Sequence, residues 1–194
     1  AALAAITAPM LAAANAGDAT AALIALQRAR VLTATRHGVN GTVAWNRRIE
    51  AWLHGQGVRT DGPWYPGQPI LVTANDHQNR VWNGDVGVVV RDDGRPVVCF
   101  PGPDGGLHRV QLLRLPAHET AWAMTVHKAQ GSEFEDVLLV MPAEPGPAWQ
   151  APLLYTGVTR ARSRAVVLAD RELLPAALAN WPARSSGLAD ALLG

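Results

Sequence analysis

The sequence predicts an α/β fold with a small antiparallel β-unit inserted into it. Segments with helical spacing alternate with short apolar runs in residues 1–66 and again in residues 117–194. In residues 67–116 the hydrophobic pattern changes to strand period, and three turn signals follow one another closely. Hydrophobic side chains make up 48% of the 194 residues, which is enough for a core.

The first part of the chain is expected to hold three helices and a strand. Asp18 or Thr20 can cap the second helix, which is expected to continue to about Arg30. Its expected apolar stripe is Leu23, Ile24 and Leu26. The other expected elements are helices over 1–14 and 41–53 and a strand over 31–35.

The third of these helices carries two neighbouring arginines, Arg47 and Arg48. Thr42 is its expected N-cap, and Gly55 is expected to end it. The arginines lie either on a solvated face or at a phosphate, because the helix starts at the edge where the preceding strand ends.

The inserted unit is expected to be a small barrel or meander of short antiparallel strands. An Asn-Gly pair at 83–84 precedes the second strand, and the Asp-Asp-Gly and Pro-Asp-Gly-Gly sequences mark two further turns. The expected strands are 69–73, 88–91, 96–100 and 107–112.

After the insertion the α/β pattern returns. Thr125 can cap a single helical turn that Gly131 closes. The expected elements are strands over 120–124, 137–141 and 165–169, helices over 153–162 and 172–180, and a tail over 184–194.

Composition excludes several classes of site. A net charge of +1 gives no basic field, so any nucleic-acid contact must come from the local placement of arginine. Cys99 is the only cysteine, which excludes an internal disulfide and fits a reducing, cytoplasmic setting. The histidines lack metal-ligand spacing, so no metal site is expected, and no apolar run is long enough to predict a membrane span.

The stretch from 121 to 134 gathers the most chemistry, including Lys128, the only lysine of the chain. Thr125 and His127 are short donors that suit sugar-phosphate contacts. Gly131 permits close approach of backbone, and Glu133 is an acceptor that suits a ribose hydroxyl. A structural turn with a satisfied histidine remains the alternative.

Three arginines follow within five residues, Arg160, Arg162 and Arg164. Helical spacing places Arg160 away from the core, so it is either solvated or directed at a phosphate, which the planar guanidinium pairs with well. We expect Arg160 and the turn after Met124 to lie side by side on one edge of the sheet.

The phosphate-binding sequence G-x-x-x-x-G-K-[ST] is absent, and Lys128 follows a histidine rather than a glycine. No acidic pair that suits Mg²⁺ follows an apolar strand. The chain by itself is therefore not expected to hydrolyse a nucleotide.

Two strings resemble motifs of superfamily 1 helicases. W-A-M-T-V-H-K-A-Q-G-S-E-F is similar to motif V, and L-Y-T-G-V-T-R-A-R-S-R is similar to motif VI. Together with W-Y-P-G-Q-P, N-G-D-V-G, R-L-P-A-H-E-T and R-S-S-G-L, they resemble the RecD family over nearly the whole chain. Members of that family are α subunits of exodeoxyribonuclease V, which acts in double-strand break repair.

This resemblance implies the second RecA-like domain of a P-loop NTPase motor, in residues 1–66 plus 117–194, with an SH3-like β-barrel inserted at 67–116. It implies an ATP-dependent DNA helicase moving 5′ to 3′, with ATP and Mg²⁺ bound mainly by a first domain that is not in this sequence. RecB, RecC and single-stranded DNA are the implied partners. By the same resemblance Arg160 is an arginine finger. Residues implied near ATP are Gly131, Glu133 and Arg48, and those implied at DNA are Thr125, His127, Lys128 and Asn83.

Two alternatives remain open. The chain could belong to a stand-alone RecD-like helicase or to a conjugative relaxase. It could instead be a non-catalytic module that binds single strands on the barrel, where Trp64, Tyr65 and Trp82 would stack on bases unless they pack in the core.

Overall fold

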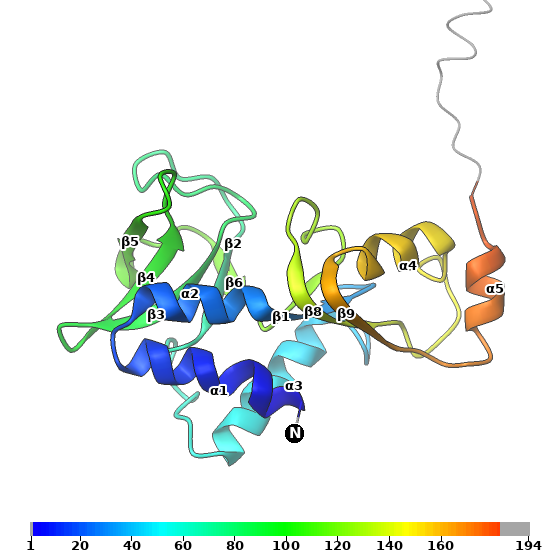
Figure 1. Cartoon of the computed structure of the whole chain (residues 1–194), viewed down its shortest axis with the longest axis horizontal. Helices are drawn as coiled ribbons and strands as arrows, with labels where there is room; N and C mark the ends of the chain where they lie inside the picture. The colour runs from blue at the N-terminus through cyan, green and yellow to red at the C-terminus, as the bar shows by residue number, and fades with distance from the viewer. Residues whose placement is uncertain (1, 183–194) are drawn as a thin grey trace, which may run out of the picture.

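The computed structural model describes residues 2–182 and arranges them as two sheets with helices packed between and beside them (Figure 1). The expected tail over 184–194 lies outside the described residues. None of the helices in residues 2–182 has the length and apolar content needed to cross a bilayer. The helices are α1 (Ala2–Asn15), α2 (Ala19–Arg28), α3 (Thr42–Gly55), α4 (Ala151–Val158) and α5 (Leu174–Ala179), and Leu112–Arg114 forms a 3-10 turn.

The α/β part is a four-stranded sheet in which every pair of neighbours is parallel. Its strands are β1 (Ala29–Thr33), β7 (Ala123–Thr125), β8 (Phe134–Val140) and β9 (Ala161–Leu168), in the order β7-β1-β8-β9. Alternate side chains of the strands point to opposite faces. Leu32 and Leu139 pack with Leu154 of α4, whereas Val31 and Val140 pack in a cluster with α2 and α3.

The inserted part is a five-stranded antiparallel sheet in the order β5-β4-β3-β2-β6, with β5 and β6 at its edges. Its strands are β2 (Pro69–Val72), β3 (Val86–Asp92), β4 (Arg95–Pro101), β5 (Leu107–Gln111) and β6 (His118–Thr120). The hairpin expected at 92–94 is confirmed, because Asp93 and Gly94 both have positive φ, as a two-residue hairpin turn requires. Cys99 is buried and forms no disulfide.

The strand expected over 120–124 is wrong, because this stretch belongs to both sheets. β6 pairs with β2, and β7 pairs with β1. The link between them is fixed from both sides. The backbone N–H of Ala121 donates to the Pro69 carbonyl oxygen at 2.9 Å, and Trp122 Nε1 donates to the Tyr65 hydroxyl at 2.7 Å. A continuous apolar run does not reveal that the chain changes sheets.

The two sheets share one apolar cluster, which fixes their relative position. Leu23 and Leu26 of α2 pack with Val88 and Val90 of the antiparallel sheet and with Val31 of the parallel sheet. In Figure 1, α2 lies beside both sheets. The inserted unit therefore packs against the α/β part and shares a hydrophobic core with it.

Three local expectations are corrected. The helix expected to reach residue 162 ends at Val158 and gives way to β9, because residues 161–168 pair with β8. Thr42 is not the N-cap: Gly41 is, and Thr42 Oγ1 shares a 2.6 Å hydrogen bond with Thr33 Oγ1. Ile24 is 58% exposed and does not belong to the apolar stripe.

Candidate functional site

The loop from 126 to 133 connects opposite ends of the parallel sheet. Thr125 is in register with Thr33, which is in register with Val140, so the loop leaves at the carboxyl edge. It re-enters at Phe134, the first residue of β8. A seven-residue strand spans about 20 Å. The residues expected to share one edge are therefore divided between two, and Arg160 neighbours only the last part of the loop.

At the carboxyl edge the structure brings together Thr125, His127 and Lys128. Thr125 Oγ1 accepts a hydrogen bond from the Lys128 N–H at 3.3 Å, and the Ala129 N–H donates to the Thr125 carbonyl oxygen at 3.1 Å. These bonds form the expected helical turn, and Gly131 ends it with a φ of +84°. His127 is exposed, so its ring faces solvent at this edge.

Lys128 and Arg36 both contact the carboxylate of Glu119 at this edge. Lys128 Nζ donates to Glu119 Oε1 at 3.0 Å, and Arg36 Nη1 donates to Glu119 Oε2 at 2.6 Å. Burial raises the pKa of the Glu119 carboxyl, but the hydrogen bonds and charges of Lys128 and Arg36 together outweigh burial. The pKa therefore lies below its ordinary value of 4.5.

The opposite edge of the sheet, where β8 and β9 begin, is the amino edge. Arg160 lies there, in the link between α4 and β9. Its Nη1 donates to the Ser132 carbonyl oxygen at 3.4 Å and its Nε to the Thr156 carbonyl oxygen at 3.3 Å. The Phe134 N–H donates to the Arg160 carbonyl oxygen at 2.9 Å, which fixes the link to the start of β8. The two guanidinium bonds are long, so they hold the group weakly.

The three clustered arginines differ in their partners. Arg162 Nε pairs with Glu133 Oε2 at 2.9 Å, and Arg164 Nη2 pairs with Asp136 Oδ2 at 2.8 Å. Within residues 2–182 no carboxylate lies within ion-pair distance of Arg160. Arg160 thus differs from Arg162 and Arg164, which both have a carboxylate partner.

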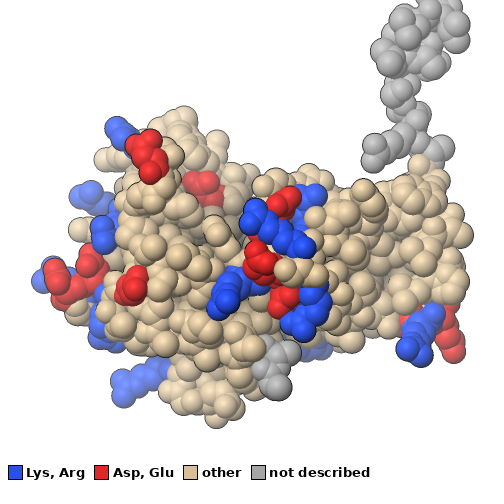
Figure 2. Space-filling view, in the orientation of Figure 1, with Lys and Arg blue, Asp and Glu red and all other residues tan. Residues whose placement is uncertain are grey.

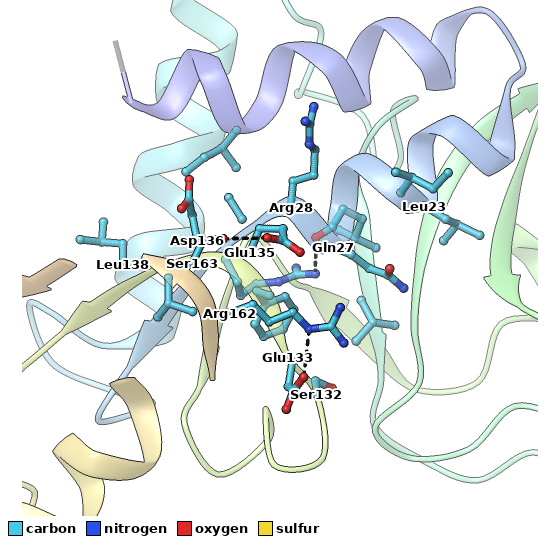
Figure 3. Close-up of a pocket in the computed structure, with 18 of the residues that line it drawn as sticks. Leu23, Gln27, Arg28, Ser132, Glu133, Glu135, Asp136, Leu138, Arg162 and Ser163 are labelled. Carbon is cyan, nitrogen blue, oxygen red and sulfur yellow. Dashed lines mark hydrogen bonds and ion pairs between the residues drawn. The ribbon is translucent and has the colours of Figure 1, made fainter. Parts of the chain in front are cut away.

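A cavity of about 1320 Å³ opens beside this edge and is lined by residues of α1, α2, the β2–β3 turn and the starts of β8 and β9. Figure 3 shows Arg162 reaching Glu133 within it, with Arg28 and Gln27 on the helix side. Charged side chains of both signs gather in the middle of the face shown in Figure 2, between the two sheets.

One arginine is buried beneath this cavity. Arg30 is 4% exposed, donates to the Ala121 and Leu26 carbonyl oxygens at 2.6 and 3.2 Å, and lies 5.0 Å from the centre of the Phe134 ring. Burial lowers its pKa to about 10. Its Nε has no hydrogen-bond partner among the described residues. Its two carbonyl bonds tie α2 to the link between the sheets, which indicates a structural role.

The remaining expected site residues lie elsewhere. Arg48 is exposed on α3, with its guanidinium 5.7 Å from the ring centre of Trp45, which lines the cavity. Asn83 is exposed in the connection between β2 and β3, where its N–H donates to Asn75 Oδ1 at 2.8 Å. Neither residue is brought into contact with the loop from 126 to 133 by any hydrogen bond or ion pair of the described residues.

Of the three aromatic residues considered for base stacking, Tyr65 belongs to the core, where it is 3% exposed. Trp64 is half-buried and stacks on His118 with ring centres 6.3 Å apart. Trp82 is 43% exposed, and its ring packs edge-to-face with that of His77, with ring centres 4.9 Å apart.

Sequence reasoning missed Arg36, Glu119 and the pairing of Arg162. Arg36 follows β1 as Lys128 follows β7, and the carboxyl ends of neighbouring parallel strands meet at one edge. That rule could have found Arg36. Glu119 gave no such signal, because it belongs to the other sheet and is 83 positions away from Arg36.

Comparison with known proteins finds relatives of this chain. The family model of the UvrD-like helicase C-terminal domain matches residues 120–168. The RecBCD enzyme subunit RecD of Mycobacterium tuberculosis (strain ATCC 25618 / H37Rv) is 42% identical over 173 residues, which cover 89% of this chain and 30% of the relative. The subunit of that name from Haemophilus influenzae is 40% identical over 162 residues, which cover 82% and 24%.

A more distant relative is the ATP-dependent RecD2 DNA helicase of Deinococcus radiodurans, 37% identical over 139 residues that cover 70% of this chain and 19% of the relative. The crystal structure of Bacteroides Pif1 bound to ssDNA is similar over 75% of this chain and 42% of that chain, with a TM-score of 0.46 and 17% identity. The chain spans less than a third of the length of the curated relatives named here.

Proposed function

Because the chain is a helicase segment related to the RecD subunits, with the α/β fold of a RecA-like helicase domain, we propose that it is the second motor domain of an ATP-dependent 5′-to-3′ DNA helicase. The observation that supports the proposal is the Arg160 guanidinium at the amino edge, which has no ion-pair partner within residues 2–182 and lies beside the loop that ends in Glu133. The carboxyl edge supplies the strand contacts.

At the amino edge, Arg160 acts as an arginine finger. Its weak bonds to two carbonyl oxygens leave donors that reach the γ-phosphate of an ATP held, with Mg²⁺, by a partner P-loop domain. Gly131 fits this surface, since the space where a side chain would extend is open. Glu133 lies at the same edge and accepts from a ribose hydroxyl, and Arg48 adds a more peripheral contact.

The bound nucleotide supplies the energy of phosphoryl transfer, and the chain supplies charge and orientation. Arg160 offsets charge that develops on the transferred group. Arg162 holds Glu133 at 2.9 Å and so limits its movement. Without the P-loop domain these residues have no phosphate to act on, so the chain alone is inactive.

At the carboxyl edge, Thr125, His127 and Lys128 contact the phosphates and sugars of single-stranded DNA. Under this proposal the nucleotide and the single-stranded DNA bind at the two ends of one loop, residues 126–133. A movement of the loop at one end is then transmitted to the other end. Asn83 contributes from the turn between β2 and β3. This turn belongs to the insertion at 67–116, which we assign to the SH3-like barrel class and which forms the antiparallel sheet together with β6. The motor domain then comprises 1–66 and 117–194.

We infer the complex, the location and the pathway of the parent protein from the names of the relatives. We place the parent protein in exodeoxyribonuclease V with RecB and RecC, in the cytoplasm, acting in double-strand break repair. The alternative is a stand-alone helicase, which the likeness to RecD2 keeps open. Copurification with two large subunits supports the first assignment, and purification as a single active polypeptide supports the second.

The test is the Arg160→Ala variant in the complete helicase, with Arg164→Ala as a matched control. Arg164 is paired with Asp136 and lies four residues along on β9. We expect Arg160→Ala to lower DNA-stimulated ATP turnover by about 10³-fold or more, with folding intact. Equal turnover in the two variants rejects the proposal.

A further inference from the structure

Three charged side chains from distant parts of the chain meet at the carboxyl edge. Arg36 follows β1, Lys128 follows β7, and Glu119 comes from β6 of the antiparallel sheet. Each oxygen of the Glu119 carboxylate accepts from one of the two cations, at 2.6 Å from Arg36 and 3.0 Å from Lys128. Two cations that contact the same carboxylate are necessarily close to each other.

The exposures show which groups face outward. The Glu119 side chain is 22% exposed, whereas those of Lys128 and Arg36 are 33% and 48% exposed. Glu119 is therefore the least exposed of the three side chains. An ammonium has three donors and a guanidinium five, and each spends one here on Glu119. The three side chains together carry a net charge of one positive unit, and among the described residues the remaining donors of Arg36 and Lys128 have no side-chain acceptor.

We propose that Arg36 and Lys128 form one phosphate-binding pair for single-stranded DNA, and that Glu119 is the positioning residue that holds the two cations in place. The inference rests on the proposed function and adds Arg36 and Glu119 to its strand-binding edge. A phosphate offers several oxygens to convergent N–H donors, and the two cations already converge on one oxyanion.

A merely structural role is the competing explanation, because Glu119 also ties the antiparallel sheet to the loops of the parallel one. The two explanations differ in the salt dependence of DNA binding. A cation that neutralises a phosphate releases counterions. Its removal makes the negative slope of log affinity against log salt concentration shallower by about 0.7 on a single strand. Loss of a structural tie leaves that slope unchanged.

The experiment measures binding of the purified chain to a fluorescein-labelled oligothymidylate by anisotropy over a series of salt concentrations. We expect Arg36→Ala and Lys128→Ala each to reduce the magnitude of the slope by about 0.7 and to weaken binding. Arg36→Lys keeps the charge and should keep the slope. Arg59→Ala, in the exposed loop after α3, is the matched control and should leave both quantities unchanged.

Glu119→Asp tests positioning at constant charge, because the shorter side chain withdraws the carboxylate from both cations. We expect weaker binding, with the melting temperature as a check on folding. Binding of Glu119→Asp equal to that of the unmodified chain overturns the role of Glu119. An unchanged slope in Arg36→Ala overturns the role of Arg36.

A second measurement needs no substitution, since Lys128 is the only lysine. Reductive methylation with ¹³C-formaldehyde labels its amine and the N-terminal amine only. We expect the lysine methyl signal to shift when the oligothymidylate is added, and a signal that does not move overturns the inference. The Arg160 experiment is independent of this edge, so loss of turnover in Arg160→Ala with an unmoved lysine signal rejects this inference and retains the proposed function.

Discussion

Arg160 Nη1 donates to the Ser132 carbonyl oxygen at 3.4 Å, across the gap between the starts of β9 and β8. This contact joins the end of the loop that begins at Thr125 to the link that follows α4. Two residues further on, Arg162 is paired with Glu133 at 2.9 Å. The end of the loop therefore contacts two arginines. Arg162 forms an ion pair with it, whereas Arg160 contacts it through a long hydrogen bond and has no ion pair within the described part of the chain.

We predict that Arg160→Lys does not preserve the activity of the complete helicase. An ammonium lacks the planar fork of a guanidinium and offers a single charge centre on a shorter reach. ATP turnover should therefore fall nearly as far as in Arg160→Ala. The free energy of unfolding should change by about 1 kcal/mol or less, because both protein bonds of Arg160 are long and neutral at the acceptor. Steady-state turnover and urea unfolding check the two halves, and near-normal turnover contradicts the prediction.

We predict that Gly157→Ala destabilises the contact between α4 and β8. A Cβ at this position would lie 2.8 and 2.9 Å from the methyl groups of Leu139, which is fully buried, so that its side chain would have to shift against its neighbours in the core. Overpacking of this kind costs about 1–3 kcal/mol. Because α4 leads directly into Arg160, turnover should fall as well. Gly146→Ala is the control, since nothing lies within 4 Å of its added Cβ, and equal melting temperatures for the two variants contradict the prediction.

We predict that Asp18→Ala costs about 1 kcal/mol of unfolding free energy, whereas Thr20→Ala costs close to none. The sequence left both residues open as the cap of α2. In the structure Asp18 Oδ1 accepts from the Ala21 N–H at 2.9 Å, and Thr20 lies exposed within the first turn. Urea unfolding of the two variants decides between them. A larger loss in Thr20→Ala would show that the cap is assigned to the wrong residue.

What the sequence predicted well depended on local pattern. The hairpin at 92–94 and the turn closed by Gly131 need positive φ, and the residues that supply it stand at those positions. Boundaries between a helix and a following strand were less secure. Leu154 to Ala165 fits a helical wheel, yet α4 ends at Val158 because pairing with β8 favours a strand from Ala161 onward.

The sequence predicted that the candidate site residues share one edge of the sheet, which they do not in the structure. Thr125 and Lys128 lie at one edge, whereas Glu133 and Arg160 lie at the opposite edge, and their roles stay predictions. That division follows from parallel pairing, which a single sequence does not display. Glu119 was out of reach for the same reason, since its contacts depend on how the second sheet packs on the first.

We predict that Glu119 makes the stability of the chain sensitive to acid. Its folded pKa lies below the ordinary 4.5, because Lys128 and Arg36 favour the carboxylate more than burial opposes it. A lowered folded pKa means a stabilising contribution that is fully present above the unfolded pKa and is lost as the pH falls below 4.5 through the folded value.

The measurement compares the melting temperature of the unmodified chain with that of Glu119→Gln between pH 3 and pH 7. The difference should be constant above about pH 5 and shrink below pH 4.5 as the carboxylate takes up its proton. Burial raises the pKa of Glu50, which acts in the opposite direction, but Glu50 is present in both proteins and cancels in the comparison. A difference that stays constant down to pH 3, or that grows with acid, would mean that Glu119 is not held as a carboxylate between the two cations.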